Sequence, residues 1–515
     1  NMFSKVKSCA VHGVDGRMID VEADVNDGLP VFTMVGYLSS SVRESSERVR
    51  TALKNSGFHL PPKRITINLS PADMRKDGSG YDLAIATAVL LSLGVTAELP
   101  MEQTLVLGEL SLDGSIKAIP GVLPMVICAR EEGMTSCIVP KENVQEAALV
   151  QGISVIGVSS LKETMEYIQG IKEYENTNVE QPAVDTSEYL YDIDFSDVVG
   201  QESIKRGMEI AAAGFHNVLL TGAAGAGKSM LAKRLPTILP QMSFEESLEV
   251  TKIYSVGGML PPEGGLIHRR PFRAPHHTIS EYALIGGGRV PTPGEVSFAH
   301  YGVLFLDELP EFSKPVLEVL RQPLEDRRIR ISRVQASYEF PADFMFVAAM
   351  NPCPCGNYPD YRRCSCTEQQ IRRYQSKVSG PLLDRIDIRM EVKGVKQEVL
   401  FSKQKTESSK TIRARVEQAR QMQKERFAGT GLLFNSQLNG KNLEEYITLS
   451  EEGKRLVLQL FEEQELSVRG VHRVLKLART IADLAGSEEI EHAHLQEAAF
   501  YRNQDVFAKE VLHGN

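Results

Sequence analysis

Hydrophobic and polar residues alternate with different periods in different parts of the chain. Near the N-terminus, short β-type runs such as Arg64–Leu69 alternate with apolar helix-type runs such as Leu83–Leu91. A polar, acidic stretch without a clear period follows, and it is typical of a linker. Next come a βαβ pattern and a helical part rich in Glu, Lys, Arg and Leu. We therefore expect an α/β multidomain protein with the parts 1–170, linker 171–193, α/β domain 194–398 and helical domain 399–515.

A glycine-rich loop lies between an apolar run, Val218–Leu220, and helix-type residues that begin at Met230. The loop reads Gly-Ala-Ala-Gly-Ala-Gly-Lys-Ser, which completes the Gly-x-x-x-x-Gly-Lys-Ser/Thr pattern. In such a loop the backbone N–H groups face nucleotide phosphates, Lys228 reaches the terminal phosphates, and the Ser229 hydroxyl ligates Mg²⁺. The sequence thus predicts a site for ATP or GTP with Mg²⁺. The expected nucleotide contacts are Gly222, Ala223, Ala224, Gly225, Ala226, Gly227, Lys228, Ser229 and Met230.

Two later apolar runs end in polar residues that suit the same site. The first ends in Asp307 and Glu308, and we expect Asp307 to hold the Mg²⁺ shell and Glu308 to polarise the attacking water. The second, Phe344–Met350, ends in Asn351, whose amide is suited to contact the γ-phosphate or the water. The alternatives are a buried strand that ends in two solvated acids, and an Asn–Pro turn.

Composition and charge narrow the class of protein. The chain has 515 residues, 42% of them hydrophobic and 24% charged, with no apolar stretch long enough to cross a bilayer. We therefore expect a cytoplasmic protein without a membrane partner. Its net charge of −9 argues against a protein coated in positive charge, but it permits a basic strip inside a pore.

One segment carries such a basic strip. Arg328, Arg330 and Ser332 alternate with Ile329 and Ile331, which predicts a strand with one basic face. Such a face suits a phosphate backbone and gives salt-sensitive binding without sequence preference. The alternative is a charged strand edge that prevents aggregation. The predicted DNA contacts are Arg327, Arg328, Arg330 and Arg333.

Four of the seven cysteines are clustered directly after Asn351. They form two Cys-x-Cys pairs, and four thiolates suit one tetrahedral Zn²⁺. The spacing is tighter than the commoner Cys-x-x-Cys, so reduced structural thiols and a regulatory disulfide stay open as alternatives. The predicted zinc ligands are Cys353, Cys355, Cys364 and Cys366.

Several motifs together resemble a known family. The segment Asp194–Gln201, the acidic strand end and the Asn351 strand resemble an AAA+ ATPase. Three further segments resemble the YifB/ComM family, a magnesium-chelatase-like branch of AAA+ proteins. These segments are Arg273–Ser280, Gly294–His300 and Gly380–Asp387. The resemblance covers essentially the whole chain and implies an AAA+ core with a parallel sheet and a C-terminal helical lid.

The resemblance also implies roles for residues outside the phosphate loop. Such proteins act as hexameric rings with nucleotide between subunits, and Arg385 matches the arginine finger. An intrachain pair of Arg385 with Asp384 or Asp387 is the alternative. Arg469 matches the second sensor arginine, with Arg473 as second choice. The basic strand corresponds to a hairpin that points into the central pore.

The N-terminal domain resembles the proteolytic α+β domain of Lon. The resemblance rests on Pro71–Ala84, Leu107–Leu110 and Ile138–Asn143. Lon-type proteolysis uses a serine nucleophile and a lysine base, yet the matching positions are Gly80 and Leu123. We therefore expect a Lon-like fold without the Ser–Lys dyad.

The function that the resemblance implies is that of an ATP-driven DNA motor. ComM-type proteins are implied to be helicases that promote branch migration in homologous recombination during natural transformation, so we expect single-stranded or branched DNA as the partner. The alternatives are an ATP-dependent protease or unfoldase that uses the N-terminal domain, and the ATPase subunit of a magnesium chelatase. The missing dyad speaks against the first, and the presence of the N-terminal domain against the second.

Overall fold

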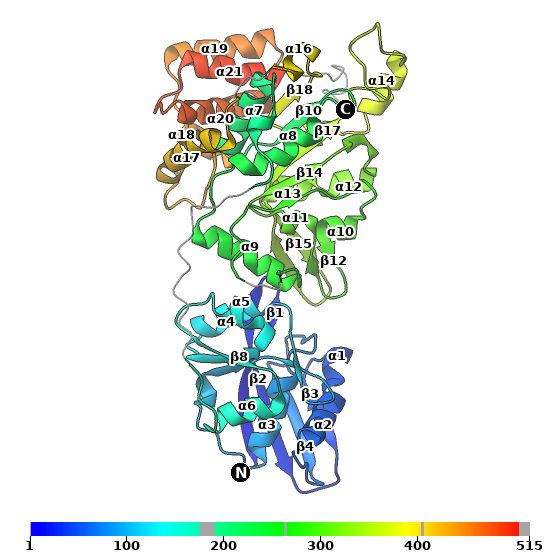
Figure 1. Ribbon diagram of the computed structural model, residues 1–515, viewed down its shortest axis with the longest axis vertical. Helices are drawn as coiled ribbons and strands as arrows, with labels where there is room; N and C mark the ends of the chain where they lie inside the picture. The colour runs from blue at the N-terminus through cyan, green and yellow to red at the C-terminus, as the bar shows by residue number, and fades with distance from the viewer. Residues whose placement is uncertain (1, 176–190, 262–264, 403–405, 504–515) are drawn as a thin grey trace.

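The computed structural model describes residues 2–175, 191–261, 265–402 and 406–503. It is an elongated molecule, with the N-terminal domain at one end, an α/β core in the middle and the C-terminal helices at the other end (Figure 1). Most of the predicted linker, and the end of the predicted helical domain, lie outside the described residues. Across the parts of the chain that the structure describes, no helix has both the length and the apolar character of a membrane span.

The N-terminal domain is an α+β domain built on a mixed seven-stranded sheet. Its elements are β1 Phe3–His12, β2 Asp15–Asn26, β3 Phe32–Val35, α1 Ser40–Arg43, α2 Ser45–Asn55, β4 Arg64–Ser70, α3 Asp82–Ser92, β5 Thr104–Val106, β6 Glu109–Leu110, β7 Ile116–Lys117, α4 Val122–Glu131, β8 Ser136–Pro140, α5 Val144–Ala147, β9 Ser154–Val158 and α6 Leu161–Ile168. The strand order is β3-β4-β2-β1-β5-β8-β9. The predicted strand and helix in this domain are confirmed as β4 and α3, and α3 is almost entirely buried.

The core is a five-stranded parallel sheet in the order β11-β14-β17-β10-β18. Its strands are β11 Phe272–Arg273, β14 Val303–Leu306, β17 Met345–Met350, β10 Val218–Thr221 and β18 Ile388–Glu391. The three central strands are buried at every position, because helices cover both faces of a parallel sheet. The helices of the core are α7 Glu202–Gly214, α8 Lys228–Arg234, α9 Phe244–Val256, α10 Glu281–Ile285, α11 Glu295–Phe298, α12 Lys314–Val319, α13 Arg321–Asp326, α14 Glu368–Gln375 and α15 Gly380–Leu383.

Two small hairpins project from this core and are not part of its sheet. One pairs β12 Gly286–Gly287 with β13 Thr292–Pro293, and the other pairs β15 Arg328–Ser332 with β16 Ser337–Pro341. Both lie at the end of the core that faces the N-terminal domain (Figure 1).

The C-terminal helices pack on the core through one shared apolar cluster. They are α16 Gln397–Leu400, α17 Ser409–Arg426, α18 Gly440–Tyr446, α19 Glu451–Glu463, α20 Val468–Leu484 and α21 His492–Asn503. The cluster joins Val218 and Met345 of the sheet to Val416 and Leu477 of the helices. His216 adds a polar link, since its ring contacts both Asp387 in the core and Thr480 in α20. The fold class predicted from the sequence, an α/β core with a helical lid after an α+β domain, is confirmed.

Candidate functional site

The phosphate loop follows β10 and ends in the first turn of α8. Gly225 and Gly227 have φ angles of +80° and +98°, a left-handed backbone that glycine adopts at little cost. This conformation turns the loop directly before the N-terminus of α8, where backbone N–H groups and the helix dipole favour an anion. The run from Gly222 to Met230 therefore has the shape of a phosphate cradle.

The two polar side chains of the loop contact the ends of neighbouring strands. The ammonium group of Lys228 donates to the carbonyls of Gly222 and Ala223 and, at 3.1 Å, to Oδ1 of Asn351. The Ser229 hydroxyl donates to the Asp307 carboxylate at 2.6 Å. Burial lowers the pKa of Lys228, and the nearby carboxylates oppose that shift.

These contacts follow from the sheet order. β10 pairs with β17, and β17 pairs with β14, all in parallel, so the residues after the three strands meet at one edge. Mg²⁺ prefers oxygen ligands such as hydroxyl and carboxylate groups, so Ser229 and Asp307 fit that ion.

Glu308 lies next to this pair in a strained conformation. Its φ of +52° is left-handed, which costs a non-glycine residue about 1 kcal/mol or more. Its N–H donates to Asp307 at 2.9 Å, and its side chain is exposed. Asp307 is thus held by Ser229, whereas Glu308 is open to solvent.

Arg385 and Arg469 lie away from the phosphate loop. Both line a cavity of about 270 Å³ between the core and the C-terminal helices, together with Arg473. Arg385 forms an ion pair of 3.2 Å with Glu325, which sequence reasoning missed. Among the residues that the structure describes, the two acids of the alternative pairs have other partners: Asp384 pairs with Arg473 at 3.2 Å, and Asp387 with His216.

Arg473 is the more buried of the two candidate sensor residues. Its side chain is 5% exposed, and among the described residues its Nη1 has no hydrogen-bond partner. Arg469 is exposed one helical turn earlier on α20. The cavity therefore brings three arginines together, one of them with a buried nitrogen that has no partner among the described residues, beside the carboxylates of Glu325, Asp343, Asp384 and Asp387.

The predicted basic strand is β15. Arg328 and Arg330 are exposed, while Ile329 and Ile331 are buried, so the structure has the alternation seen in the sequence. Sequence reasoning missed Glu339 on β16, which lies opposite Arg330 and forms ion pairs with Arg328 at 3.1 Å and with Arg330 at 3.7 Å.

The side chain at one end of this hairpin strand is already engaged in the protein. The Arg333 guanidinium donates twice to the carbonyl of Gly288, in the loop between β12 and β13. Arg327 has a left-handed φ of +59° where α13 ends. Of the four arginines predicted to contact DNA, Arg328 and Arg330 are therefore the pair that β15 presents on its exposed face.

The cysteine cluster lies against the phosphate loop. All four thiols are free, and their sulfur atoms lie within 4.8 Å of one another. Three of the sulfur–sulfur separations, 3.3, 3.9 and 3.6 Å, are close to the roughly 3.8 Å between thiolates on one tetrahedral Zn²⁺. Gly356, inside the cluster, lies beside the backbone of Ala223 and Ala224. The donor set fits zinc, and its loop contacts the nucleotide site directly.

The two positions that match the Lon dyad carry no reactive group. A Cβ atom on Gly80 would lie 3.1 Å from the Ile119 side chain, and Leu123 is fully buried in an apolar cluster with Ile119. Ser79 is partly exposed, one position away. A lysine base in place of Leu123 would therefore put a polar group into the apolar core.

Comparisons with known proteins agree with this geometry. Three family models match successive segments: magnesium chelatase subunit ChlI at 194–400, subunit ChlI of Mg-chelatase at 21–143, and the ChlI C-terminal part at 406–502. Lon protease 2 of Bacillus subtilis is 30% identical over 183 residues, which are 32% of this chain and 32% of that protein.

Two relatives are similar along nearly the whole chain. Competence protein ComM of Haemophilus influenzae is 41% identical over 503 residues, which cover 96% of this chain and 97% of that protein. The uncharacterized protein YifB of Escherichia coli is 40% identical over 507 residues, which cover 98% and 97%. With this extent of similarity and a phosphate loop, acidic strand end and helical lid in place, the chain belongs to the YifB/ComM family of magnesium-chelatase-like AAA+ ATPases.

Proposed function

We propose that this chain is an ATP-driven DNA motor that assembles into a homohexameric ring and acts as a helicase on single-stranded or branched DNA. The observation that carries the proposal is the exposed face of β15, where Arg328 and Arg330 project from the same core as the phosphate loop. Positive side chains on one face suit a phosphate backbone and read no base sequence. The competence name of one full-length relative supports a role in natural transformation, and we propose that the motor promotes branch migration there.

Each residue around the loop has a separate role in the hydrolysis of ATP. Lys228 and the loop N–H groups hold the terminal phosphates, and Asn351 contacts the γ-phosphate beside Lys228. Glu308, which is exposed, orients the attacking water and accepts its proton. Ser229 and Asp307 hold magnesium, which when bound would neutralise charge on the phosphate oxygens.

The separation of Arg385 from the loop supports a ring. An arginine finger stabilises the charge that develops on the γ-phosphate, and this contribution is worth roughly 10³ to 10⁵ in rate. Arg385 opens instead on the cavity shared with Arg469 and Arg473. We propose that this arginine cavity receives the γ-phosphate held by the phosphate loop of a neighbouring subunit, so that each site is completed by two chains.

The ion pairs of Glu339 adjust the affinity of Arg328 and Arg330 for DNA. Exposed ion pairs contribute only about 0 to 1 kcal/mol, so a phosphate group can replace the carboxylate beside Arg328 and Arg330. Six subunits would place twelve such arginines around a central strand. Binding of this kind releases counterions and weakens steeply as salt rises.

We infer that Cys353, Cys355, Cys364 and Cys366 hold one zinc ion. The sulfur separations support this inference, as does the oxygen-free donor set, which favours zinc over magnesium. A zinc ion bound by these cysteines would stiffen the loop beside Ala223 and Ala224.

The test compares ATP hydrolysis by the purified full chain alone, with single-stranded DNA, with duplex and with a branched junction. We expect DNA to raise the rate, and we expect the double variant Arg328→Ala/Arg330→Ala to lose most of this rise and to bind DNA about tenfold or more weakly. A matched control is Lys454→Ala/Arg455→Ala, which removes two exposed positive charges from α19.

The motor proposal fails if DNA neither binds at low salt nor changes hydrolysis. ATP-dependent cleavage of an unfolded protein substrate by the same preparation would favour the protease alternative instead. That alternative has little support at Gly80 and Leu123, where a nucleophile and a base are needed.

A further inference from the structure

The β15–β16 hairpin depends on its surroundings for its position. Its strands are five residues long and pair only with each other. A two-stranded hairpin of this size is marginal by itself in water. Its buried face packs in the core, and Arg333 ties its tip to the β12–β13 loop. The outer strand, β16, faces the N-terminal domain.

The turn between β1 and β2 reaches this outer strand from the N-terminal domain. The His12 ring stacks on Tyr338, with ring centroids 4.4 Å apart and planes inclined by 23°. A ring nitrogen of His12 also lies 3.0 Å from the carbonyl oxygen of Ser337. In Figure 1, β1 extends out of its own domain as far as the hairpins of the core.

Gly13 brings the turn into backbone contact with Glu339. A Cβ atom on Gly13 would lie 2.8 Å from the carbonyl oxygen of Glu339, and the φ angle of Gly13 is +66°. Both the contact and the left-handed backbone require glycine. Glu339 is the residue whose carboxylate pairs with Arg328 and Arg330. The turn therefore touches the residue that holds both arginines.

The next residue of the turn is buried in the core. Val14 is 8% exposed and belongs to the apolar cluster that contains Ile329, Ile331 and Phe340 of the hairpin. Asp15 follows, with an ion pair of 3.2 Å to Lys252 on α9. An open cleft of about 960 Å³ lies beside the turn, and Asp15 and Arg328 both line it.

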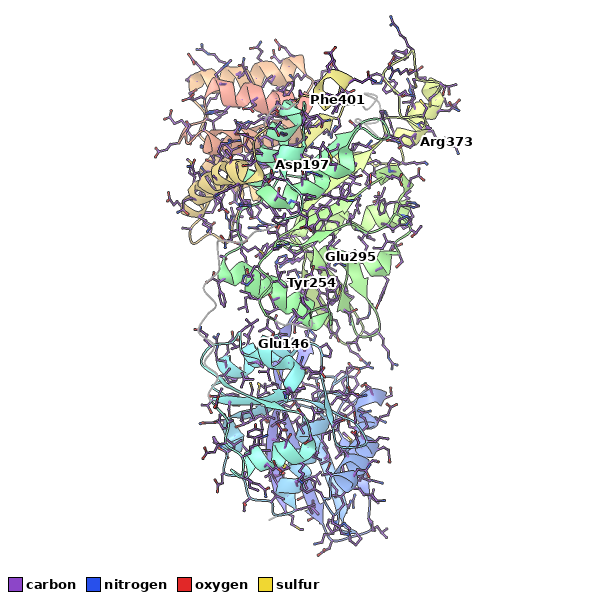
Figure 2. The ribbon with its side chains drawn as sticks, in the orientation of Figure 1. Glu146, Asp197, Tyr254, Glu295, Arg373 and Phe401 are labelled. Carbon is purple, nitrogen blue, oxygen red and sulfur yellow. The ribbon has the colours of Figure 1, made fainter. Side chains whose placement is uncertain are left out.

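Contacts between α4, α5 and α9 fix the rest of the N-terminal domain to the core. The Gly121 N–H donates to the Ser255 carbonyl at 2.9 Å, and the Ser255 hydroxyl donates to Glu146 at 2.7 Å. Figure 2 shows Glu146 at the end of the N-terminal domain, with Tyr254 on the facing part of the core. Because the domain is held on α9, its turn meets the hairpin at a defined place.

We propose that the turn His12–Asp15, which we call the brace turn, is a positioning element that holds the β15–β16 hairpin in place for DNA. This proposal rests on the proposed function for its DNA part. It gives the N-terminal domain a task without peptidase chemistry: it sets the position of Arg328 and Arg330. The brace turn acts through its contacts with Tyr338 and Glu339.

The test uses the full chain with Gly13→Ala and His12→Ala, each with a matched control. Gly133→Ala introduces a side chain at a similar φ, +86°, in open space, and His59→Ala removes an exposed histidine of the same domain. Hydrogen exchange of the segment Ile329–Phe340 reports the hairpin without any DNA. DNA affinity is measured in parallel on a single-stranded oligonucleotide.

We expect both brace variants to exchange hairpin amides about tenfold faster than the controls and to bind DNA about fivefold or more weakly. Unchanged exchange in both variants overturns the proposal, and unchanged affinity with faster exchange overturns its DNA part. If the wild-type protein binds no DNA but the exchange rises, the motor function fails while the positioning role stands. If Gly13→Ala does not fold, the same measurements on His12→Ala decide the test.

Discussion

The Lys228 ammonium group lies 3.1 Å from the side-chain oxygen of Asn351, so the phosphate loop and the end of β17 are joined through their functional groups. The two strands that precede them pair in parallel, with Thr221 opposite Met350. A phosphate that engages Lys228 therefore also changes what Asn351 contacts. We therefore expect β17 to respond to the state of the nucleotide.

Replacing Asn351 should separate binding of ATP from its hydrolysis. We expect Asn351→Ala to bind a fluorescent ATP analogue nearly as well as the wild type, because the loop N–H groups and Lys228 remain. Hydrolysis should fall about 10²-fold, the usual loss when one polar group at the reacting phosphate is removed. Asn357→Ala, in the neighbouring cysteine loop, is the control. Loss of nucleotide binding in Asn351→Ala would contradict this role.

The arginine cavity should act on the nucleotide of a neighbouring subunit. We expect Arg385→Ala to bind ATP but to hydrolyse it about 10³-fold more slowly. Glu308→Gln should be equally inactive. Mixing the two inactive proteins should restore part of the activity, since some interfaces then combine an intact Glu308 with an intact Arg385.

Steady-state phosphate release from mixtures of varied ratio measures this complementation. Glu325→Gln is a useful control, because it removes the ion-pair partner of Arg385 and leaves the finger in place. Mixtures that stay inactive at every ratio would show that Arg385 does not act across an interface.

The cysteine cluster should carry metal in the purified protein. We expect close to one zinc per chain by elemental analysis when no chelator is used, and most of it should be lost in Cys353→Ser. Cys137→Ser is the matched control, since Cys137 is equally buried but lies in β8, outside the cluster. Zinc near zero in the wild type, or equal zinc in both variants, would contradict the assignment.

Asp387 should stabilise the protein in a pH-dependent way. Burial would raise the pKa of Asp387, but Lys476 and His216 outweigh it and lower the pKa from 3.8 to about 2. The charged form thus favours the folded state; this stabilisation is fully present above about pH 4 and is lost as the pH falls through about 2.

Accordingly, Asp387→Asn should lower the free energy of unfolding by about 2 kcal/mol at pH 7, with a smaller loss at pH 3. Urea unfolding followed by circular dichroism at both pH values measures the difference. Asp326→Asn, at an exposed position, should have little effect. An equal loss at pH 7 and pH 3 would show that the charge of Asp387 is not the cause.

The sequence alone predicted the features whose geometry depends on a short, contiguous pattern of residues. The phosphate loop needs its glycines at fixed spacings within one short segment, and the alternation of Arg328 and Ile329 already separates an exposed from a buried face. Burial of whole strands such as Val303–Leu306 was equally predictable, because a parallel sheet covered on both sides needs continuous apolar runs.

Contacts between distant segments were not predictable in the same way. The pairing of Glu339 with Arg330 depends on the register of a hairpin, which a shift of one residue would change. The meeting of Arg385 with Arg469 depends on how the C-terminal helices pack on the core. The contact of Gly13 with Glu339 joins two domains, and no local pattern in either segment indicates it.

In the proposed motor, the carboxylate of Glu339 would matter most for release of the DNA. A protein that travels along DNA must loosen its hold once in every cycle, and an arginine left without a partner would make that step slow. Glu339 pairs with both Arg328 and Arg330, so we expect each departure from a phosphate backbone to be compensated within the same hairpin. We therefore expect this residue to make the binding of DNA reversible, as repeated stepping requires.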